Sequence, residues 1–264
     1  MARVVITGCS TGFGRATAAE LAGRGHEVIA TARRVESLEG LDVARHLALD
    51  VDRDDSVAAL RAEIGPVDVL INNAGIDQHG PVESYPPERA RQLFETNFWG
   101  AFRMVQAFAP AMREQGSGII VNLSSVQGVV GTPLGGLYAA TKHAIEALSE
   151  SLHYELGHFG VRVVIVEPGY FATEMPNKHR DDLITGSPYE ELDRQWSRTS
   201  TTLNPGGRPG PEVVAVAIAD AVESAGSPLR LPVGADAELV CSARDQLDDA
   251  GFEDLMRKTL DLTW

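Results

Sequence analysis

The chain has very little cysteine: Cys9 and Cys241 are the only two in 264 residues. Two thiols cannot build the disulfide framework of a small secreted domain, and their spacing is not that of a zinc site. No apolar run is long enough to cross a bilayer, and the N-terminal residues lack the pattern of a signal peptide. We therefore expect a cytoplasmic protein that does not bind membranes.

Positive charge is also scarce. Only 23 Lys and Arg residues stand against 37 Asp and Glu, which gives a formal net charge of −14. This charge repels nucleic-acid backbones and anionic lipid surfaces, so neither is an expected partner. Hydrophobic residues make up 44% of the chain, a value typical of globular rather than disordered proteins.

Short apolar runs alternate with amphipathic stretches over the first two-thirds of the chain. The apolar runs predict strands over residues 4–6, 28–30, 46–49, 67–71, 119–123 and 161–166, with a last strand over 229–231. Helical spacing predicts helices over residues 14–22, 54–64, 87–115, 136–156 and 211–224, followed by a helical tail. Strands that are apolar throughout are typical of a sheet covered on both faces. The pattern predicts one α/β domain over residues 1–264, a doubly wound, Rossmann-type parallel sheet with helices on both faces.

The alternation stops after Pro168 and Gly169. Residues 170–210 are polar, contain several Pro and Gly residues, and predict a long irregular insert. Inserts of this kind in compact domains commonly form lids or binding loops. We expect a substrate loop here, in which Met175, Tyr189 and Trp196 could line an apolar pocket or merely dock the loop.

A glycine-rich turn joins the first predicted strand to the first predicted helix. Gly8, Gly12 and Gly14 have the spacing G-x3-G-x-G, which differs from the common dinucleotide fingerprint. Glycine permits a tight turn and close approach of the backbone to a ligand, and a helix start offers free N–H groups to a phosphate. The turn therefore predicts a dinucleotide site, with a tight turn that binds nothing as the alternative.

Polar residues also follow two other predicted strands. Asp50 ends the third strand, where it could contact an adenine ring or simply cap the next helix. Asn73, Ala74 and Gly75 follow the fourth strand and suit close packing beneath a cofactor, although an ordinary polar loop would look the same. In open α/β sheets, ligands bind at these carboxyl ends of the strands.

Tyr138 and Lys142 lie four residues apart in a predicted helix, and therefore on one face of it. A free tyrosine titrates near pH ~10, and an adjacent ammonium group lowers that pKa. The pair could thus carry a proton to or from an alcohol or a carbonyl. Ser125, at the end of the fifth strand, could donate a hydrogen bond to the substrate oxygen. Each residue alone also has an ordinary explanation, such as a solvent-facing lysine or a serine that caps a turn.

Together these motifs resemble the classical short-chain dehydrogenases/reductases, over nearly the whole chain and most firmly over residues 3–173. The matching features are the T-G-x3-G-x-G turn, N-N-A-G, Asn97 in T-N-F-W-G, the 13-residue interval from Ser125 to Tyr138, Y-x-x-x-K, the P-G pair and Thr173. The motifs are most similar to those of members that act on hydroxysteroids or retinoids.

The resemblance implies a set of catalytic residues and a mechanism. Tyr138 would be the general acid/base, and Lys142 would lower its pKa and hold the nicotinamide ribose. Ser125 would orient the substrate oxygen, and Asn97 would hold a water in a proton relay. The cofactor-binding residues implied are Gly8, Ser10, Thr11, Gly12, Phe13, Gly14, Arg33, Arg34, Asp50, Val51, Asn73, Ala74, Gly75, Tyr138, Lys142, Pro168, Gly169, Phe171 and Thr173. The resemblance implies no metal. It also implies a homodimer or homotetramer that packs through residues 87–115 and 136–156.

Arg33 and Arg34 end the second predicted strand, where a site that prefers NAD carries an acid for the ribose 2′-hydroxyl. Two arginines could instead bind a 2′-phosphate, so NADP is the expected cofactor and NAD the second choice. The alternative is a solvated basic turn. The glycine turn carries Ser10 rather than a basic residue, so one of the family's usual signals for NADP is absent.

The expected function is an NADP(H)-dependent oxidoreductase that interconverts a secondary alcohol and a ketone or aldehyde, with a small-molecule substrate. A non-catalytic dinucleotide-binding regulator on the same fold is one alternative, although such proteins usually lose the tyrosine or the lysine. A nucleotide-sugar epimerase or dehydratase is another, although those chains are longer and space their glycines differently.

Overall fold

The computed structural model describes residues 1–173 and 183–264. One sheet is formed by β1 (Arg3–Ile6), β2 (Glu27–Ala32), β3 (Arg45–Ala48), β4 (Val69–Asn72), β5 (Gly118–Leu123), β6 (Val161–Pro168) and β7 (Arg230–Val233). Its strands are parallel, in the order β3-β2-β1-β4-β5-β6-β7. The order reverses between β1 and β4, the point at which doubly wound sheets bind their ligands.

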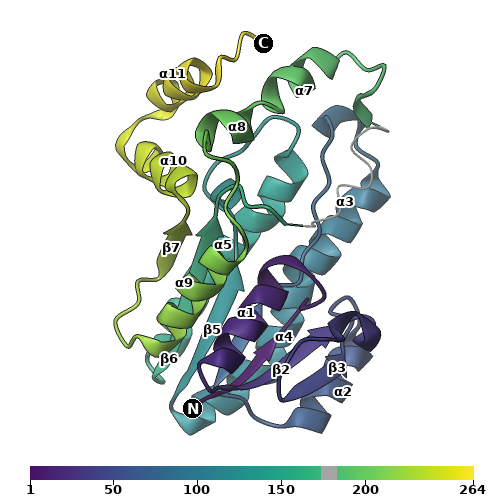
Figure 1. Ribbon diagram of the computed structural model, residues 1–264, viewed down its shortest axis with the longest axis vertical. Helices are drawn as coiled ribbons and strands as arrows, with labels where there is room; N and C mark the ends of the chain where they lie inside the picture. Colours follow the sequence, from purple (N-terminus) through teal and green to yellow (C-terminus); the bar gives the residue numbers. More distant parts are fainter. Residues whose placement is uncertain (174–182) are drawn as a thin grey trace.

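Helices cover both faces of the sheet, as Figure 1 shows. The helices α1 (Gly12–Gly23) and α9 (Glu212–Glu223) pack on one face, and α2 (Asp54–Ile64), α4 (Gly100–Gln115) and α5 (Gly136–Gly157) pack on the other. Along β1, Val4 and Ile6 belong to the first apolar layer and Val5 to the second, and all three are fully buried. Burial of both faces explains the continuous apolar strands, and the predicted fold class is confirmed.

The predicted helix over residues 87–115 is not one regular helix. The helix α3 (Pro87–Phe94) passes into a π-helical segment, Glu95–Trp99, before α4 begins. Such π turns insert an extra residue and rotate the side chains around it, which is why they recur at functional sites. Here the turn buries Asn97 and leaves Trp99 45% exposed. Helical periodicity cannot reveal an insertion of this kind, because the flanking apolar spacing continues on both sides.

The insert after β6 is not irregular throughout. Its described part contains the short helices α7 (Glu190–Trp196) and α8 (Thr199–Leu203). The tail forms α10 (Ala235–Gln246) and α11 (Asp249–Leu260), which gather with α7 and α8 at one end of the molecule (Figure 1). Trp196 is buried and Tyr189 half-buried, whereas Met175 lies outside the described residues. None of the helices in the described ranges is long and apolar enough to cross a membrane.

Candidate active site

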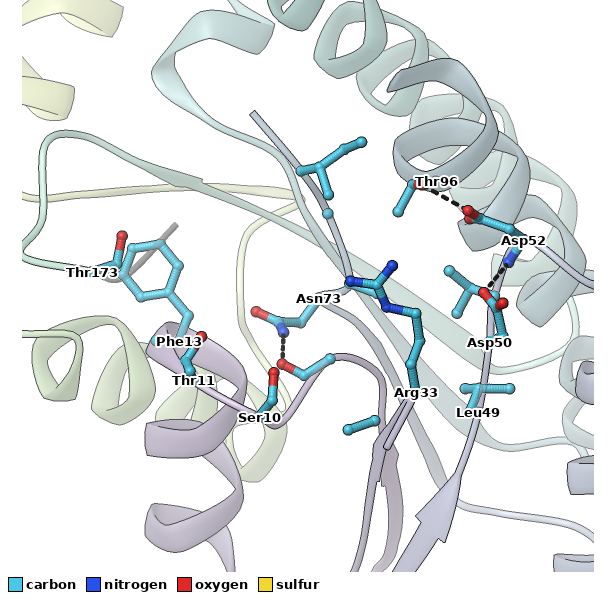
Figure 2. Close-up of a pocket in the computed structure, with 17 residues that line it drawn as sticks. Ser10, Thr11, Phe13, Arg33, Leu49, Asp50, Asp52, Asn73, Thr96 and Thr173 are labelled. Carbon is cyan, nitrogen blue, oxygen red and sulfur yellow. Dashed lines mark hydrogen bonds between the residues drawn. The ribbon is translucent and has the colours of Figure 1, made fainter. Parts of the chain in front are cut away.

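A cavity of about 300 Å³ opens at the carboxyl ends of β1, β2, β3 and β4 (Figure 2). Twelve residues expected to bind a cofactor line it: Gly8, Ser10, Thr11, Gly12, Phe13, Arg33, Asp50, Val51, Asn73, Ala74, Gly75 and Thr173. Residues that follow five different strands, β1, β2, β3, β4 and β6, are thus brought to one place by the parallel sheet. Asp52, Ile76 and Thr96 also line the cavity, and none of them was expected to bind the cofactor, although Thr96 begins the T-N-F-W-G motif.

The glycine turn is shaped so that other residues would not fit. Gly8 and Gly12 have φ angles of +74° and +57°, a region that side chains disfavour. A Cβ on Gly14 would collide with the carbonyl of Gly8 and with the amide of Asn73. The Asn73 Nδ2 donates to the carbonyls of Gly8 (3.0 Å) and Thr7 (2.8 Å), which fixes the turn against the end of β4. The backbone is therefore held close to the cavity at the start of α1, as a pyrophosphate requires.

The structure separates the two arginines that the sequence presents as a pair. Arg33 lines the cavity, and Figure 2 shows its side chain extending into it from the end of β2. Arg34 is exposed and precedes the 3-10 segment Val35–Leu38, and it does not line this cavity. Of the two arginines, Arg33 is therefore the one that borders a group bound at the end of β2.

A second cavity, of about 270 Å³, adjoins the first. Phe13 and Thr173 line both, so the two volumes share a wall. The expected site residues Ser125, Tyr138, Pro168, Gly169 and Phe171 line the second cavity. It also contains residues that the sequence analysis did not single out, among them Asp77, His79, Gln127, Tyr170 and Arg208. A ligand in the glycine-turn cavity would thus be next to the Ser125 and Tyr138 hydroxyls.

Tyr138 and Lys142 lie one turn apart on α5, and both are at least nine-tenths buried. The Lys142 Nζ lies 5.6 Å from the centroid of the Tyr138 ring and donates to the carbonyl of Leu123 at 2.7 Å. Burial lowers the pKa of Lys142 to about 8, because it disfavours the ammonium. Lys142 lines neither of the two cavities, whereas Tyr138 lines the second.

The pKa of Tyr138 is raised well above its ordinary value. Burial is the main cause, the charge of Asp77 adds to it, and a hydrogen bond with Ser125 acts in the opposite direction. Burial thus outweighs the hydrogen bond, and the phenol is protonated at neutral pH. The lowering of this pKa by Lys142 that the resemblance implies stays a prediction.

Asn97 is held in place by hydrogen bonds on both sides of its amide. Its Nδ2 donates to the carbonyl of Ile76 (2.9 Å) and to Thr141 Oγ1 (3.1 Å), and its Oδ1 accepts from the Ile76 N–H (2.8 Å). Ser125 precedes the 3-10 segment Val126–Gly128, and its Oγ accepts from the Gln127 N–H at 3.1 Å. Its hydroxyl hydrogen is directed into the second cavity, where it can be donated to the Tyr138 oxygen or to a substrate oxygen.

The buried residue Asp236, at the start of α10, fixes the turn that carries Gly169. Its Oδ2 accepts from the Tyr170 N–H at 2.7 Å and from Asn204 Nδ2 at 3.1 Å. A Cβ on Gly169 would collide with this carboxylate, so the glycine is required by packing. Sequence reasoning missed Asp236, and its only local signal is an acid in the first turn of a helix.

Comparison with known proteins agrees with this geometry. The family model described as short chain dehydrogenase matches residues 2–184. A 3-ketodihydrosphingosine reductase of Bacteroides thetaiotaomicron is 35% identical, over 88% of this chain and 87% of its own. Human retinol dehydrogenase 8 is 40% identical, over 66% of this chain and 60% of its own. A solved short chain dehydrogenase of Burkholderia cenocepacia, in complex with NADP, is 26% identical with a TM-score of 0.77 and covers 98% of this chain and 97% of its own.

The family match spans more than half of the chain, and it includes the glycine turn, Asn97, Ser125, Tyr138 and Lys142. The fold, the strand order and the relatives agree with it. The chain therefore belongs to the classical short-chain dehydrogenase/reductase family, whose members are oxidoreductases that act on alcohols and carbonyl compounds.

Proposed function

We propose that this protein is an NADP(H)-dependent oxidoreductase that interconverts a secondary alcohol and a ketone or aldehyde. The observation that carries the proposal is that the two cavities adjoin: Phe13 and Thr173 line both the cavity at the glycine turn and the cavity that contains Ser125 and Tyr138. A nicotinamide that lies where the two cavities meet would face a substrate oxygen held by the Ser125 and Tyr138 hydroxyls.

The residues of the first cavity suit the parts of the cofactor in turn. The start of α1 and the turn at Gly8 and Gly12 would hold the pyrophosphate, because no Cβ blocks the backbone there. Arg33 would bind the 2′-phosphate of NADP, since the end of β2 carries no acid for a 2′-hydroxyl. Asp50 and Val51 would contact the adenine, with Asn73, Ala74 and Gly75 beneath the ribose. The structure of the Burkholderia neighbour in complex with NADP supports this choice.

The second cavity would bind the substrate and move the proton, while the bound NADPH supplies the hydride. In reduction, Tyr138 gives its phenolic proton to the carbonyl oxygen, which becomes the hydroxyl of the product. In oxidation, the phenolate oxygen of Tyr138 takes the proton from the hydroxyl of the alcohol. Ser125 donates a hydrogen bond to the substrate oxygen and stabilises the charge that develops on it. Because burial keeps Tyr138 protonated at neutral pH, the free enzyme is ready to act as the acid.

Lys142 and Asn97 act behind the tyrosine. Lys142 would hold the ribose of the nicotinamide and favour the phenolate after proton transfer. Asn97 would hold a water that connects Lys142 with solvent; its Nδ2 and one site of its Oδ1 are already engaged. The water would therefore bind the second lone pair of Oδ1 or the main-chain carbonyl. The turn at Pro168 and Gly169, with Phe171 and Thr173, would border the nicotinamide.

A turnover screen tests the function directly. The purified enzyme is mixed with NADPH or NADH and a series of ketones and aldehydes of graded size, and with NADP⁺ or NAD⁺ and the corresponding alcohols. We expect absorbance changes at the nicotinamide band that depend on the carbonyl compound and are faster with NADPH. Tight binding of a dinucleotide without turnover of any compound would instead support the non-catalytic regulator.

A further inference from the structure

The second cavity contains an acidic side chain that the proposed chemistry does not use. Asp77, just beyond the end of β4, lines this cavity together with Ser125 and Tyr138. Its Oδ2 lies 3.2 Å from His79 Nε2. Its Oδ1 is shielded from solvent and has no hydrogen-bond partner among the described residues. A buried carboxylate oxygen without a partner costs free energy, so a native protein seldom keeps one without a use for it.

Asp77 is also close enough to the reacting groups to influence them. Its charge raises the pKa of Tyr138 and that of Lys142. A negative charge beside Tyr138 disfavours the phenolate, which Tyr138 must form whenever it gives up its proton. The carboxylate is therefore unfavourable for the proton transfer itself. Its presence is better explained by something that it binds.

The charged side chains near this carboxylate make contacts other than a hydrogen bond with its Oδ1. His79 is on the same loop and contacts only Oδ2. Arg208 lies over the ring of Tyr170, with 5.7 Å between its guanidinium carbon and the ring centroid. Lys142 does not line this cavity, and its Nζ donates to the carbonyl of Leu123. Of the residues described, Asp77 is the one carboxylate that lines the cavity, so a cation bound there would be drawn toward it.

We propose that Asp77 is a specificity-determining residue that binds a protonated amine close to the reacting carbon, so that the substrates are amino alcohols and the corresponding amino ketones. This inference rests on the proposed oxidoreductase function and names its substrate class. The ammonium would occupy the side of the cavity next to Asp77 while the neighbouring oxygen meets Ser125 and Tyr138. The aromatic side chains of Tyr170 and Trp196 line the same cavity and would contact the rest of the molecule.

Three matched alcohols test the proposal: 2-amino-1-phenylethanol, 1-phenyl-1,2-ethanediol and 1-phenylethanol. They differ only in the substituent on the carbon next to the carbinol carbon: an amine, a hydroxyl or a hydrogen. Binding to the enzyme saturated with NADP⁺ is measured by calorimetry, and kcat and KM are measured separately. We expect the parent protein to bind the amine about ten- to a hundredfold more tightly than 1-phenylethanol, the range of a charge-assisted hydrogen bond. The diol should lie between the two.

The variant Asp77→Asn removes the charge but keeps the shape, and should abolish most of this preference through KM and Kd. Binding of 1-phenylethanol, which carries no cation, should change far less than binding of the amine. Asp77→Ser serves as a second variant if the first is unstable in a thermal melt. The matched control is Asp42→Asn, which removes an exposed carboxylate from a loop outside both cavities and should change nothing.

The outcomes separate this proposal from the function on which it rests. Equal binding of the amine and of 1-phenylethanol by the parent protein would overturn the assignment of Asp77, and so would a preference that survives in Asp77→Asn. If the amine binds selectively but no alcohol or ketone is converted, the binding role of Asp77 holds and the oxidoreductase function fails.

Discussion

The side chain of Asn97 binds both backbone polar groups of Ile76, with its Nδ2 on the carbonyl at 2.9 Å and its Oδ1 on the N–H at 2.8 Å. This pair of hydrogen bonds joins the π-helical turn before α4 to the loop that follows β4. The loop carries Gly75 on the side of the first cavity and Asp77 on the side of the second. One buried amide thus fixes the position of two neighbouring parts of the site, and it does so because the π turn directs it inward.

The first prediction concerns the proton carrier. Tyr138→Phe keeps the buried ring and removes the hydroxyl, so the fold and the binding of NADPH should be preserved. Turnover should fall by about 10² or more, the scale of general acid/base catalysis. Steady-state kinetics on a converted ketone, with a thermal melt as control, measure the effect. A variant with turnover close to the parent value would exclude Tyr138 as the acid.

The second prediction uses the separation of the two arginines. Arg33→Ala should weaken NADPH binding by roughly ten- to a hundredfold, the value of a charge-assisted contact, and leave NADH binding nearly unchanged. Arg34→Ala is the matched control, because it removes the same charge from outside the cavity. Fluorescence titration with both nucleotides measures the four affinities. An equal effect of the two substitutions would mean that general charge, rather than a contact, sets the preference.

The third prediction concerns the link between the tail and the insert. Gln195 of α7 accepts hydrogen bonds from the N–H groups of Thr263 (3.0 Å) and Trp264 (3.3 Å), next to the cavity residue Trp196. Gln195→Ala should loosen α7 and raise the KM for substrate several-fold, with little change in NADPH affinity. Gln246→Ala is the control, because Gln246 is exposed and bonds only within α10. A change in NADPH affinity without a change in KM would contradict this role.

The fourth prediction concerns the pH dependence of stability. Burial and the neighbouring Glu146 raise the pKa of Glu167 to about 7, and Arg230 opposes them. Because the folded state binds this proton more tightly than the unfolded state, the parent protein should lose stability as the pH rises from about 4.5 to about 7.

The variant Glu167→Gln keeps the neutral form at every pH. Relative to the parent protein, it should therefore gain on the order of 1–3 kcal/mol of unfolding free energy between pH 5 and pH 8. Denaturant titrations at the two pH values measure the difference. A stability difference between variant and parent that does not change with pH would show that Glu167 does not titrate in this range.

The fifth prediction concerns assembly. Phe98, Trp99 and Phe102 form an aromatic cluster at the junction with α4, with the Trp99 ring 5.0 and 5.8 Å from the other two and 45% exposed. We expect a homodimer or homotetramer that buries this cluster. Trp99→Glu should shift sedimentation at micromolar concentration toward the monomer, whereas Val213→Glu, on the exposed side of α9, should not. A parent protein that sediments as a monomer would remove the prediction.

Local sequence determined a large part of this protein. The apolar runs produce the strands because both faces of the sheet are buried, so that a residue such as Val5 is fully shielded from solvent. The glycine turn could be identified because Gly8 and Gly12 adopt backbone conformations that other residues disfavour. Tyr138 and Lys142 could be paired because the helical repeat places them on one face.

Contacts between distant segments decided the rest. Arg33 and Arg34 are chemically identical, exposed neighbours, and only the path of the chain after β2 makes Arg33 and not Arg34 line the cavity. Asp236 is far along the sequence from Tyr170, yet it accepts a hydrogen bond from the Tyr170 N–H. Asp77 and Tyr138 line one cavity only because the end of β4 lies near the start of α5. Periodicity and propensity describe neighbours along the chain, whereas these contacts depend on the packing of elements separated by many residues, which no local pattern records.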